Sequence, residues 1–199
     1  MISALILAAG QSKRMGRPKM LLPWGETTVL QTVIATFKAA GVEDILVVTG
    51  GERERVEALV GSLTRTVFNG DYAEGEMLSS VQAGLKGMKS EAEAVLIGLG
   101  DQPQVRERSV RAVLEEYRQS GASLVVPSYQ MRRGHPWLVT REHWGEILGL
   151  RSPESLRDFL NRHASEIRYV ELDSSTILQD LDTPEDYLKS RPYRDRINM

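Results

Sequence analysis

Short, nearly unbroken apolar runs recur from the start of the chain to residue 126. They lie at residues 2–8, 45–49, 94–99 and 123–126. A strand with one wet face alternates apolar and polar residues, so an unbroken run predicts a strand buried on both faces of its sheet. Such strands need a covering layer on each side, and this confines the chain to a few layered architectures.

Segments of helical periodicity lie between these runs. Apolar residues spaced i, i+3, i+4, i+7 predict two helices, each with one buried stripe. The stripes are Leu30, Val33, Ile34 and Phe37 in the first helix, and Val110, Val113, Leu114 and Tyr117 in the second. Further helices are expected over 52–60 and 77–88. Strands that alternate with helices are typical of a doubly wound α/β fold with a mostly parallel sheet.

Beyond Pro127 the pattern is less regular. A turn is expected at 133–136, helices near 141–148 and 153–162, and a strand over 167–172. This looser order of elements indicates that the sheet becomes mixed in the last third of the chain.

The size and composition limit the function classes. The 199 residues suit one domain, predicted over 1–190 and followed by a polar tail at 191–199. A net charge of −2 gives no basic field for a polyanion, so nucleic acid is not expected as a partner. The absence of cysteine excludes disulfides, thiolate metal sites and a thiol nucleophile. The run at 2–8 is too short to cross a bilayer and lacks leading positive charges, so a cytoplasmic protein that does not bind membranes is predicted.

The loop after the first run is the first candidate site, because open α/β sheets bind ligands beyond the carboxyl ends of their strands. Residues 7–19 read Leu-Ala-Ala-Gly-Gln-Ser-Lys-Arg-Met-Gly-Arg-Pro-Lys. Gly10 and Gly16 let backbone N–H groups approach a phosphate, and Arg14 and Lys19 add positive charge. The glycine spacing matches neither Walker A nor Gly-x-Gly-x-x-Gly. A triphosphate-binding loop is predicted, against the alternative of a solvated basic loop whose glycines serve turns.

Two acidic loops follow later strands. Asp101 lies in Gly-Asp-Gln-Pro directly after the run at 94–99, where the alternative is a helix N-cap. Asp182 follows the last predicted strand; Thr183 and Pro184 there suit a helix start and leave Asp182 free. Carboxylates beside a triphosphate are the ligands that Mg²⁺ prefers. Asp101 and Asp182 are therefore the predicted magnesium ligands, with Asp180 as the fallback for the second.

Taken together, four motifs resemble the molybdenum cofactor cytidylyltransferase branch of the MobA-like NTP transferases. They are Leu-Ala-Ala-Gly-x-Ser-x-Arg-Met-Gly-x-Pro-Lys, Gly-Asp-Gln-Pro, Arg-Gly-His-Pro and Asp-x-Asp-Thr-Pro-Glu-Asp, within residues 2 to 188. The first occurs in many nucleotidyltransferases, whereas the four in this order are more specific. The resemblance implies a Rossmann-like mixed sheet flanked by helices. It also implies a magnesium-dependent transfer of CMP from CTP to the terminal phosphate of molybdopterin, with release of pyrophosphate.

The resemblance also assigns roles to individual residues. The implied nucleotide-binding residues are Ala8, Ala9, Gly10, Arg14, Gly16, Lys19, Ser80 and Asp101. Among them Arg14, Lys19 and Asp101 are the implied catalytic groups, and Asp101 with Asp182 would hold Mg²⁺. Arg133, Gly134 and His135 would lie on the acceptor side. For Ser80 the alternative is a helix start capped by Ser79 or Ser80, and a lone histidine in a Gly-Pro turn is more often structural.

Some features bear on the choice of substrate. The guanylyl branch usually carries glycine in place of Ala9, and the segment 20–24, Met-Leu-Leu-Pro-Trp, matches the cytidylyl branch better. A methyl group at position nine is expected to narrow the space over the loop and to favour CTP over GTP, while Trp24 is expected to serve core packing. Trp137 departs from the family, in which a smaller aliphatic residue is more usual, and this bears on the acceptor pocket.

Two other functions remain open at this point. A guanylyl- or cytidylyltransferase for a sugar or polyol phosphate would share the first two motifs. A non-catalytic carrier or chaperone of molybdenum cofactor would keep the nucleotide fold, although Lys19 and Asp101 favour an enzyme. The molybdoenzyme that receives the cofactor is a further expected partner.

Overall fold

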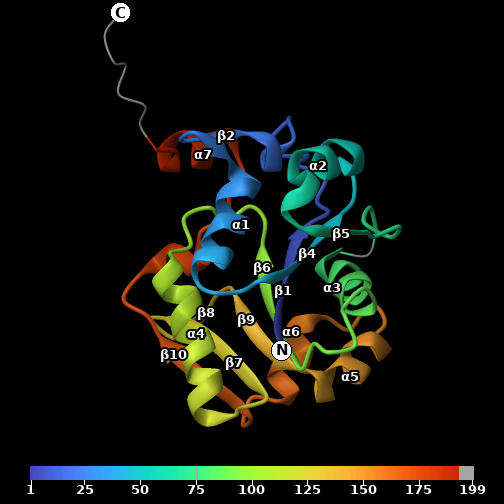
Figure 1. The fold of residues 1–199 in the computed structure, drawn as a ribbon, viewed down its shortest axis with the longest axis vertical. Coiled ribbons are helices and arrows are strands. Elements are labelled where there is room, and N and C mark those ends of the chain that lie inside the picture. The colour runs from blue at the N-terminus through green and yellow to red at the C-terminus, as the bar shows by residue number, and fades with distance from the viewer. Residues whose placement is uncertain (75, 193–199) are drawn as a thin grey trace, which may run out of the picture.

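The main sheet of the computed structural model is mixed and mostly parallel, as predicted. The structure describes residues 1–74 and 76–192. Within them the sheet has eight strands in the order β10-β7-β9-β6-β1-β4-β5, with β8 paired to β7 (Figure 1). The strands are β1 (Ile2–Ala8), β4 (Asp44–Thr49), β5 (Arg65–Phe68), β6 (Ala94–Leu99), β7 (Leu124–Tyr129), β8 (Arg132–Arg133), β9 (Trp137–Thr140) and β10 (Ile167–Glu171). A separate hairpin consists of β2 (Pro23–Trp24) and β3 (Thr27–Thr28).

Strand direction decides where the loops meet. β1 pairs in parallel with β4 and β6, β4 with β5, and β7 with β10. The exception is β9, which lies antiparallel between β6 and β7. Because β6 and β7 both oppose β9, they point the same way. The carboxyl ends of β1, β4, β6, β7 and β10 therefore share one edge of the sheet.

Helices cover both faces of the sheet. They are α1 (Val29–Ala39), α2 (Arg53–Val60), α3 (Glu76–Lys86), α4 (Glu107–Ser120), α5 (Trp144–Gly149), α6 (Leu156–Arg162) and α7 (Pro184–Ser190). Short 3₁₀ helices are η1 (Lys19–Leu21), η2 (Gly61–Leu63), η3 (Arg141–His143) and η4 (Ser175–Leu178). Buried residues of α1, α2 and α4 join one hydrophobic cluster, and those of α3, α5 and α6 join the other. This is the two-sided covering that the unbroken apolar runs predict.

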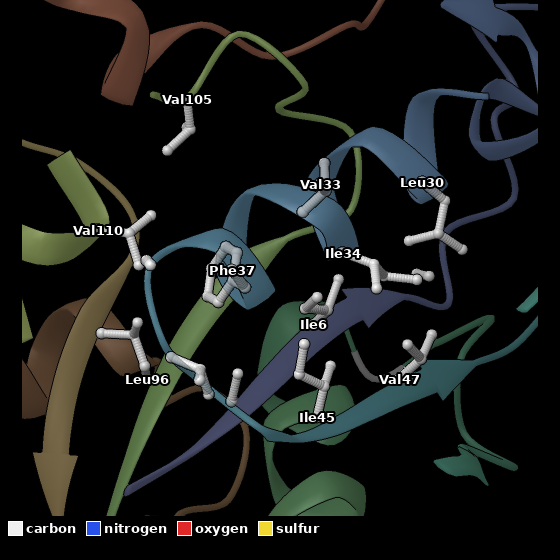
Figure 2. Close-up of a cluster of buried hydrophobic side chains, with 14 of the residues drawn as sticks. Ile6, Leu30, Val33, Ile34, Phe37, Ile45, Val47, Leu96, Val105 and Val110 are labelled. Carbon is white, nitrogen blue, oxygen red and sulfur yellow. The ribbon is translucent and has the colours of Figure 1, made fainter. Parts of the chain in front are cut away.

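Successive residues of β1 divide between the two clusters. Ala4 and Ile6 belong to the first, and Leu5 and Leu7 to the second. Figure 2 shows α1 lying over the strands in the first cluster, with the ring of Phe37 directed at the sheet. A Cβ on Gly98 would lie 2.4 Å from that ring, so a glycine in β6 makes room for it. The predicted stripe on α1 is buried, and so is that on α4 except for Tyr117, which is only partly buried.

The sequence pattern missed several short elements. It did not predict β5, whose residues alternate between partly buried and exposed at the edge of the sheet. It also missed the β2–β3 hairpin and β9, a strand of four residues that lies between β7 and the more distant β6. The helix expected from residue 153 starts at Leu156, after a cap by Ser155. The helix expected near residue 141 begins as η3 and becomes α5.

The end of the chain bears on two expectations. Residues 191 and 192 of the predicted tail are exposed, and the rest of it lies outside the described residues. No helix within residues 1–74 and 76–192 has the length and apolar character needed to span a membrane.

Candidate active site

Three loops meet beyond the carboxyl ends of β1 and β6, at the upper end of the molecule in Figure 1. The N–H of Gly100, which follows β6, donates to Leu7 O of β1 at 2.9 Å. The N–H of Leu181 donates to Asp101 O at 3.1 Å. These bonds join the loop after β6 to β1 and to the acidic segment before α7. The predicted site segments are therefore brought together.

Four charged side chains form a network in this place. Lys19 Nζ donates a short hydrogen bond to Asp101 Oδ2 and lies 3.4 Å from Asp182 Oδ1. Arg14 Nη2 lies 3.0 Å from the other oxygen of Asp182. Lys19 and Asp101 are largely buried, whereas the Arg14 side chain is 72% exposed. The two predicted metal ligands thus share Lys19 as a partner, while Arg14 pairs with Asp182 and remains accessible to a ligand.

A third carboxylate stands beside this network. Gln102 Nε2 donates to Asp180 Oδ1 at 2.7 Å. Loss of solvation around Asp180 and the negative charges of Asp101 and Asp182 raise the pKa of its carboxyl. Sequence reasoning did not assign Gln102, although it lies within the Gly-Asp-Gln-Pro motif. Its amide orients Asp180, the fallback ligand.

These carboxylates suit a hard divalent cation. Asp101 and Asp182 offer oxygen atoms to the same positive group, Lys19 Nζ. Mg²⁺ takes oxygen ligands from one or two carboxylates and fills its remaining positions with phosphate oxygens and water. The donor set therefore fits magnesium, and it offers no imidazole that would favour a softer metal.

The loop after β1 folds around Ser12. The N–H groups of Met15 and Gly16 donate to Ser12 O at 3.0 and 3.1 Å, and the N–H of Lys19 donates to Ser12 Oγ at 3.1 Å. Gly16 has φ +67°, a conformation that suits glycine. The backbone position of Lys19 is therefore set by Ser12, a residue to which sequence reasoning gave no role.

A cavity of about 260 Å³ opens beside this loop. It is lined by Gly10, Gln11, Ser12, Lys13, Arg14, Lys19, Tyr72 and Asp182. Most of these residues come from the predicted phosphate loop, while Tyr72 comes from the segment after β5. Nothing lies within 4 Å of a Cβ built on Gly10, so the backbone there is open to a ligand. Tyr72 had no signal in the sequence, because β5 itself was missed.

The side chains of Ala8 and Ala9 point into the core, which corrects the expectation that the Ala9 methyl group narrows the space over the loop. Both side chains are buried, one in each hydrophobic cluster. Ala9 packs against Gly50, where an added Cβ would lie 2.8 Å from the Ala9 methyl, and Ala9 O accepts from the N–H of Gly51 at 3.3 Å. The methyl group thus packs into the core instead of narrowing the space over the loop. The steric argument for CTP is wrong on this point.

Ser80 lies inside α3 and not at its start. Because α3 begins at Glu76, the alternative in which Ser79 or Ser80 caps the helix is wrong. Asn69 Nδ2 donates to Ser80 Oγ at 3.1 Å and to Ser79 Oγ at 2.9 Å. Asn69 is itself buried after β5. The hydroxyl of Ser80 therefore fastens α3 to that turn, and sequence reasoning missed Asn69.

The predicted acceptor residues line a second, larger cavity of about 960 Å³. Arg133 Nε donates to Tyr169 Oη at 2.9 Å, and its Nη1 donates to Asn161 Oδ1 at 2.8 Å. Trp137 in β9, whose backbone pairs with Ile97 of β6, also lines this cavity. The bulky residue that departs from the family pattern is thus a buried wall of the pocket. Tyr169 and Asn161 were not predicted.

Gly134 and His135 connect this cavity to η4. A Cβ on Gly134 would lie 2.5 Å from Ile177 O, so only glycine fits there. The N–H of His135 donates to the same oxygen at 3.1 Å. Burial lowers the pKa of His135 to about 4, so its imidazole is neutral at pH 7. His135 therefore offers the cavity an uncharged polar ring.

The acidic loop leads directly into α7, whose first turn fixes the end of the loop. Thr183 Oγ1 accepts from the N–H of Asp186 at 3.2 Å, and Asp186 Oδ2 accepts from the N–H of Thr183 at 2.9 Å. Pro184 stands at the first helical position, as predicted. Tyr187 Oη donates to Pro23 O at 2.7 Å, and Leu181 joins a buried cluster with Trp24, the predicted core residue.

The Thr183 cap can be tested by its effect on stability. Thr183→Ala should lower the free energy of unfolding by about 1 kcal/mol, because one N–H at the start of α7 loses its acceptor. Thr183→Ser keeps the oxygen and should stay close to wild type. Urea unfolding measures both variants. Equal losses in the two variants would show that the hydroxyl oxygen does not cap the helix.

Comparison with known proteins agrees with this geometry. Residues 4–167 match the MobA-like NTP transferase domain. Over 194 residues the chain is 31% identical to the molybdenum cofactor cytidylyltransferase of Escherichia coli (strain K12), covering 96% of this chain and 95% of that protein. It is 28% identical over 192 residues to the nicotine blue oxidoreductase of Paenarthrobacter nicotinovorans, covering 92% and 93%. Rv0371C of Mycobacterium tuberculosis H37Rv, solved in complex with manganese, is 28% identical with a TM-score of 0.79, covering 94% and 96%.

The family model covers most of the chain, and the similarity to the Escherichia coli protein extends over nearly the full length of both sequences. The resemblance drawn from the four motifs is confirmed. This chain belongs to the MobA-like NTP transferase family and is a nucleotidyltransferase of that type.

Proposed function

We propose that this protein transfers CMP from CTP to the terminal phosphate of molybdopterin or molybdenum cofactor and releases pyrophosphate. The network of Lys19, Asp101, Asp182 and Arg14 beside an open cavity carries the proposal. Its charges match a triphosphate and the cation that accompanies it. The choice of CTP and of the acceptor rests on the similarity to the Escherichia coli cytidylyltransferase.

The reaction needs no nucleophile from the protein. An oxygen of the acceptor phosphate, already an anion, attacks the α-phosphorus of CTP, and the bond from that phosphorus to the bridging oxygen of the β-phosphate breaks. The protein positions the two phosphates and stabilises charge as it grows on the leaving pyrophosphate. In this proposal the positive charges of Lys19 and Arg14 stabilise the pyrophosphate, and the backbone of Gly10 and Gly16 lies along the triphosphate.

Asp101 and Asp182 would hold Mg²⁺. When bound, the ion neutralises charge on the phosphates of the nucleotide. Lys19 contacts both carboxylates and is largely buried, so its positive charge compensates them in the protein alone. The same residue is then well placed to turn from a carboxylate to a phosphate oxygen when nucleotide enters.

The larger cavity supports a bulky acceptor. Its volume of about 960 Å³ lies at the upper end of the range for small-molecule sites. Arg132, Arg133 and Arg157 line it, together with the aromatic rings of Tyr169 and Trp137. Cationic and flat apolar groups together suit a phosphorylated ring system such as a pterin. A sugar or polyol phosphate would leave much of this space unfilled.

The test is a turnover assay with the untagged protein, each nucleoside triphosphate and purified molybdopterin. We expect pyrophosphate release and a CMP adduct detected by mass. Release with a sugar or polyol phosphate instead would identify the alternative acceptor class. Binding of molybdopterin without pyrophosphate release would indicate a carrier that passes the cofactor to a molybdoenzyme. One relative is named an oxidoreductase. A product that differs in mass from the acceptor by only two hydrogens would show oxidation or reduction in place of nucleotidyl transfer, and would overturn the proposal.

The nucleotide preference is a separate prediction. We expect kcat/KM for CTP to exceed that for GTP by at least about tenfold, a difference of about 1.4 kcal/mol. The support is the similarity to a cytidylyltransferase and the segment Met20 to Trp24, since the methyl group of Ala9 does not face the loop. Equal concentrations of CTP and GTP in competition, with the base identified by mass, measure it. An excess of GMP adduct would place the protein with the guanylyl enzymes.

A further inference from the structure

Two histidines and a glutamate converge at the end of the molecule opposite the nucleotide loops. His143 ends η3, His163 follows the last residue of α6, and Glu166 precedes β10. Figure 1 places α5 and α6 near the N-terminus at the lower end, whereas α2 and α7 lie at the upper end. The cluster is thus separate from the proposed transferase site, and its residues belong to neither candidate cavity.

The donor atoms of this cluster are close together. One ligand atom from each of His143, His163 and Glu166 lies within 4.8 Å of the other two. His163 Nδ1 is 2.8 Å from Glu166 Oε1, and His143 Nε2 is 3.6 Å from Glu166 Oε2. The two imidazole rings meet edge to face with centroids 4.7 Å apart. His143 at the end of η3 and the short segment 163–166 between α6 and β10 therefore present their donors to one point.

The opposite nitrogen of His163 is also held. His163 Nε2 lies 2.7 Å from Glu146 Oε2, and Glu146 Oε1 accepts from Arg162 Nη2 at 2.9 Å. A histidine that binds a metal through one nitrogen commonly donates its other N–H to a carboxylate, which fixes the orientation of the ring. Glu146 provides such a carboxylate, and Arg162 fixes Glu146. The supporting layer of a metal site is thus present beside the donors.

The chemistry of the donors selects the ion. Imidazole nitrogen with carboxylate oxygen suits Zn²⁺, whereas Mg²⁺ prefers oxygen alone. Tetrahedral zinc with bonds of about 2.0–2.2 Å places neighbouring ligand atoms about 3.3–3.5 Å apart. The observed separations lie on both sides of that value, so small side-chain movements reach it. His143 would exchange its 3.0 Å contact with Ser123 Oγ for the metal.

We propose that His143 Nε2, His163 Nδ1 and the carboxylate of Glu166 bind one Zn²⁺, with water in the fourth position. His143 is 8% exposed and packs edge-on against the fully buried Phe159. The Glu166 side chain, 47% exposed, leaves the site open on one side. The ion joins η3, the end of α6 and the start of β10. These elements adjoin the segment that carries Leu156, Leu160 and Asn161 to the acceptor cavity.

The test is equilibrium dialysis of the untagged, chelator-treated chain against Zn²⁺ in the presence of millimolar Mg²⁺, which occupies the proposed Asp101–Asp182 site. We expect one Zn²⁺ per chain and an X-ray absorption spectrum with two imidazole nitrogens. His163→Gln should weaken binding at least a hundredfold, and Glu146→Gln about tenfold, as for a supporting carboxylate. Glu154→Gln is the matched control: Glu154 pairs with the same Arg162 at 3.0 Å but supplies no ligand. It should bind within twofold of wild type.

Three results would overturn the proposal. They are no bound zinc, unchanged affinity in His163→Gln, and loss of zinc in Asp101→Ala, which would place the ion at the nucleotide loops. If His163→Gln does not fold, Glu166→Gln replaces a partly exposed carboxylate and decides the question in the same assay. These outcomes do not depend on nucleotidyl transfer, so the zinc site and the proposed function fail separately.

Discussion

Replacing Asp101 by alanine should abolish nucleotidyl transfer and leave the fold intact, with kcat lowered by on the order of a thousandfold or more. A cation that neutralises charge in the transition state contributes several kcal/mol, and about 4 kcal/mol corresponds to that factor. The carboxylate contacts Lys19, whereas the bond that holds Leu181 is made by the main-chain oxygen of Asp101. The substitution therefore removes the ligand without releasing the acidic loop.

Pyrophosphate release at saturating nucleotide measures this effect, and circular dichroism with thermal unfolding checks the fold. Glu185→Ala is a suitable control, because Glu185 is an exposed carboxylate on the neighbouring α7 and lies outside the charged network. It should keep wild-type turnover. An Asp101→Ala protein that retains a tenth of wild-type turnover would refute the assignment of Asp101 as a metal ligand.

Lys19→Ala should lower kcat by about a hundredfold or more and change KM much less. The leaving pyrophosphate carries more charge in the transition state than in bound CTP, so a cation directed at it acts mainly on the rate. The N–H of Lys19, which anchors the loop to Ser12, remains in the variant. The side chain can therefore be removed without loosening the loop.

Steady-state kinetics with CTP separate the two parameters. Lys13→Ala gives a matched comparison, because Lys13 lines the same cavity from the same loop but does not belong to the network with Asp101 and Asp182. Its kcat should fall by less than about tenfold. If Lys19→Ala raises KM with kcat unchanged, Lys19 serves nucleotide binding and not the chemical step.

The strands that sequence predicted well are those buried on both faces. β1 and β6 read as unbroken apolar runs because successive residues enter different clusters, and α1 and α4 read as helices because each buries one stripe. β5 and β9 were missed for opposite reasons. β5 is half-exposed at an edge, while β9 is short and depends on partners in β6 and β7 that no local pattern reveals.

The same division holds in the site. Lys19, Asp101 and Asp182 could be predicted to meet, because each follows a strand that ends at the same edge or belongs to a recognisable motif. Tyr72 and Tyr169 could not, since each reaches its cavity from a segment without a motif. Ala9 is a case in which the sequence did not predict the direction of the side chain. Its identity fits a branch of the family, but the direction of its methyl group depends on the contact with Gly50.

The reversed strand β9 has a consequence for how this enzyme family can diversify. It lies between β6, which leads into the nucleotide loops, and β7, which leads to the acceptor cavity. Two strand spacings, about 10 Å, therefore separate the halves of the sheet. We expect exchange of the cavity residues on β8, α6 and β10 between relatives to change the acceptor, while Lys19, Asp101 and Asp182 stay unchanged. One side of the sheet would then vary between relatives, while the side that binds the triphosphate stays constant.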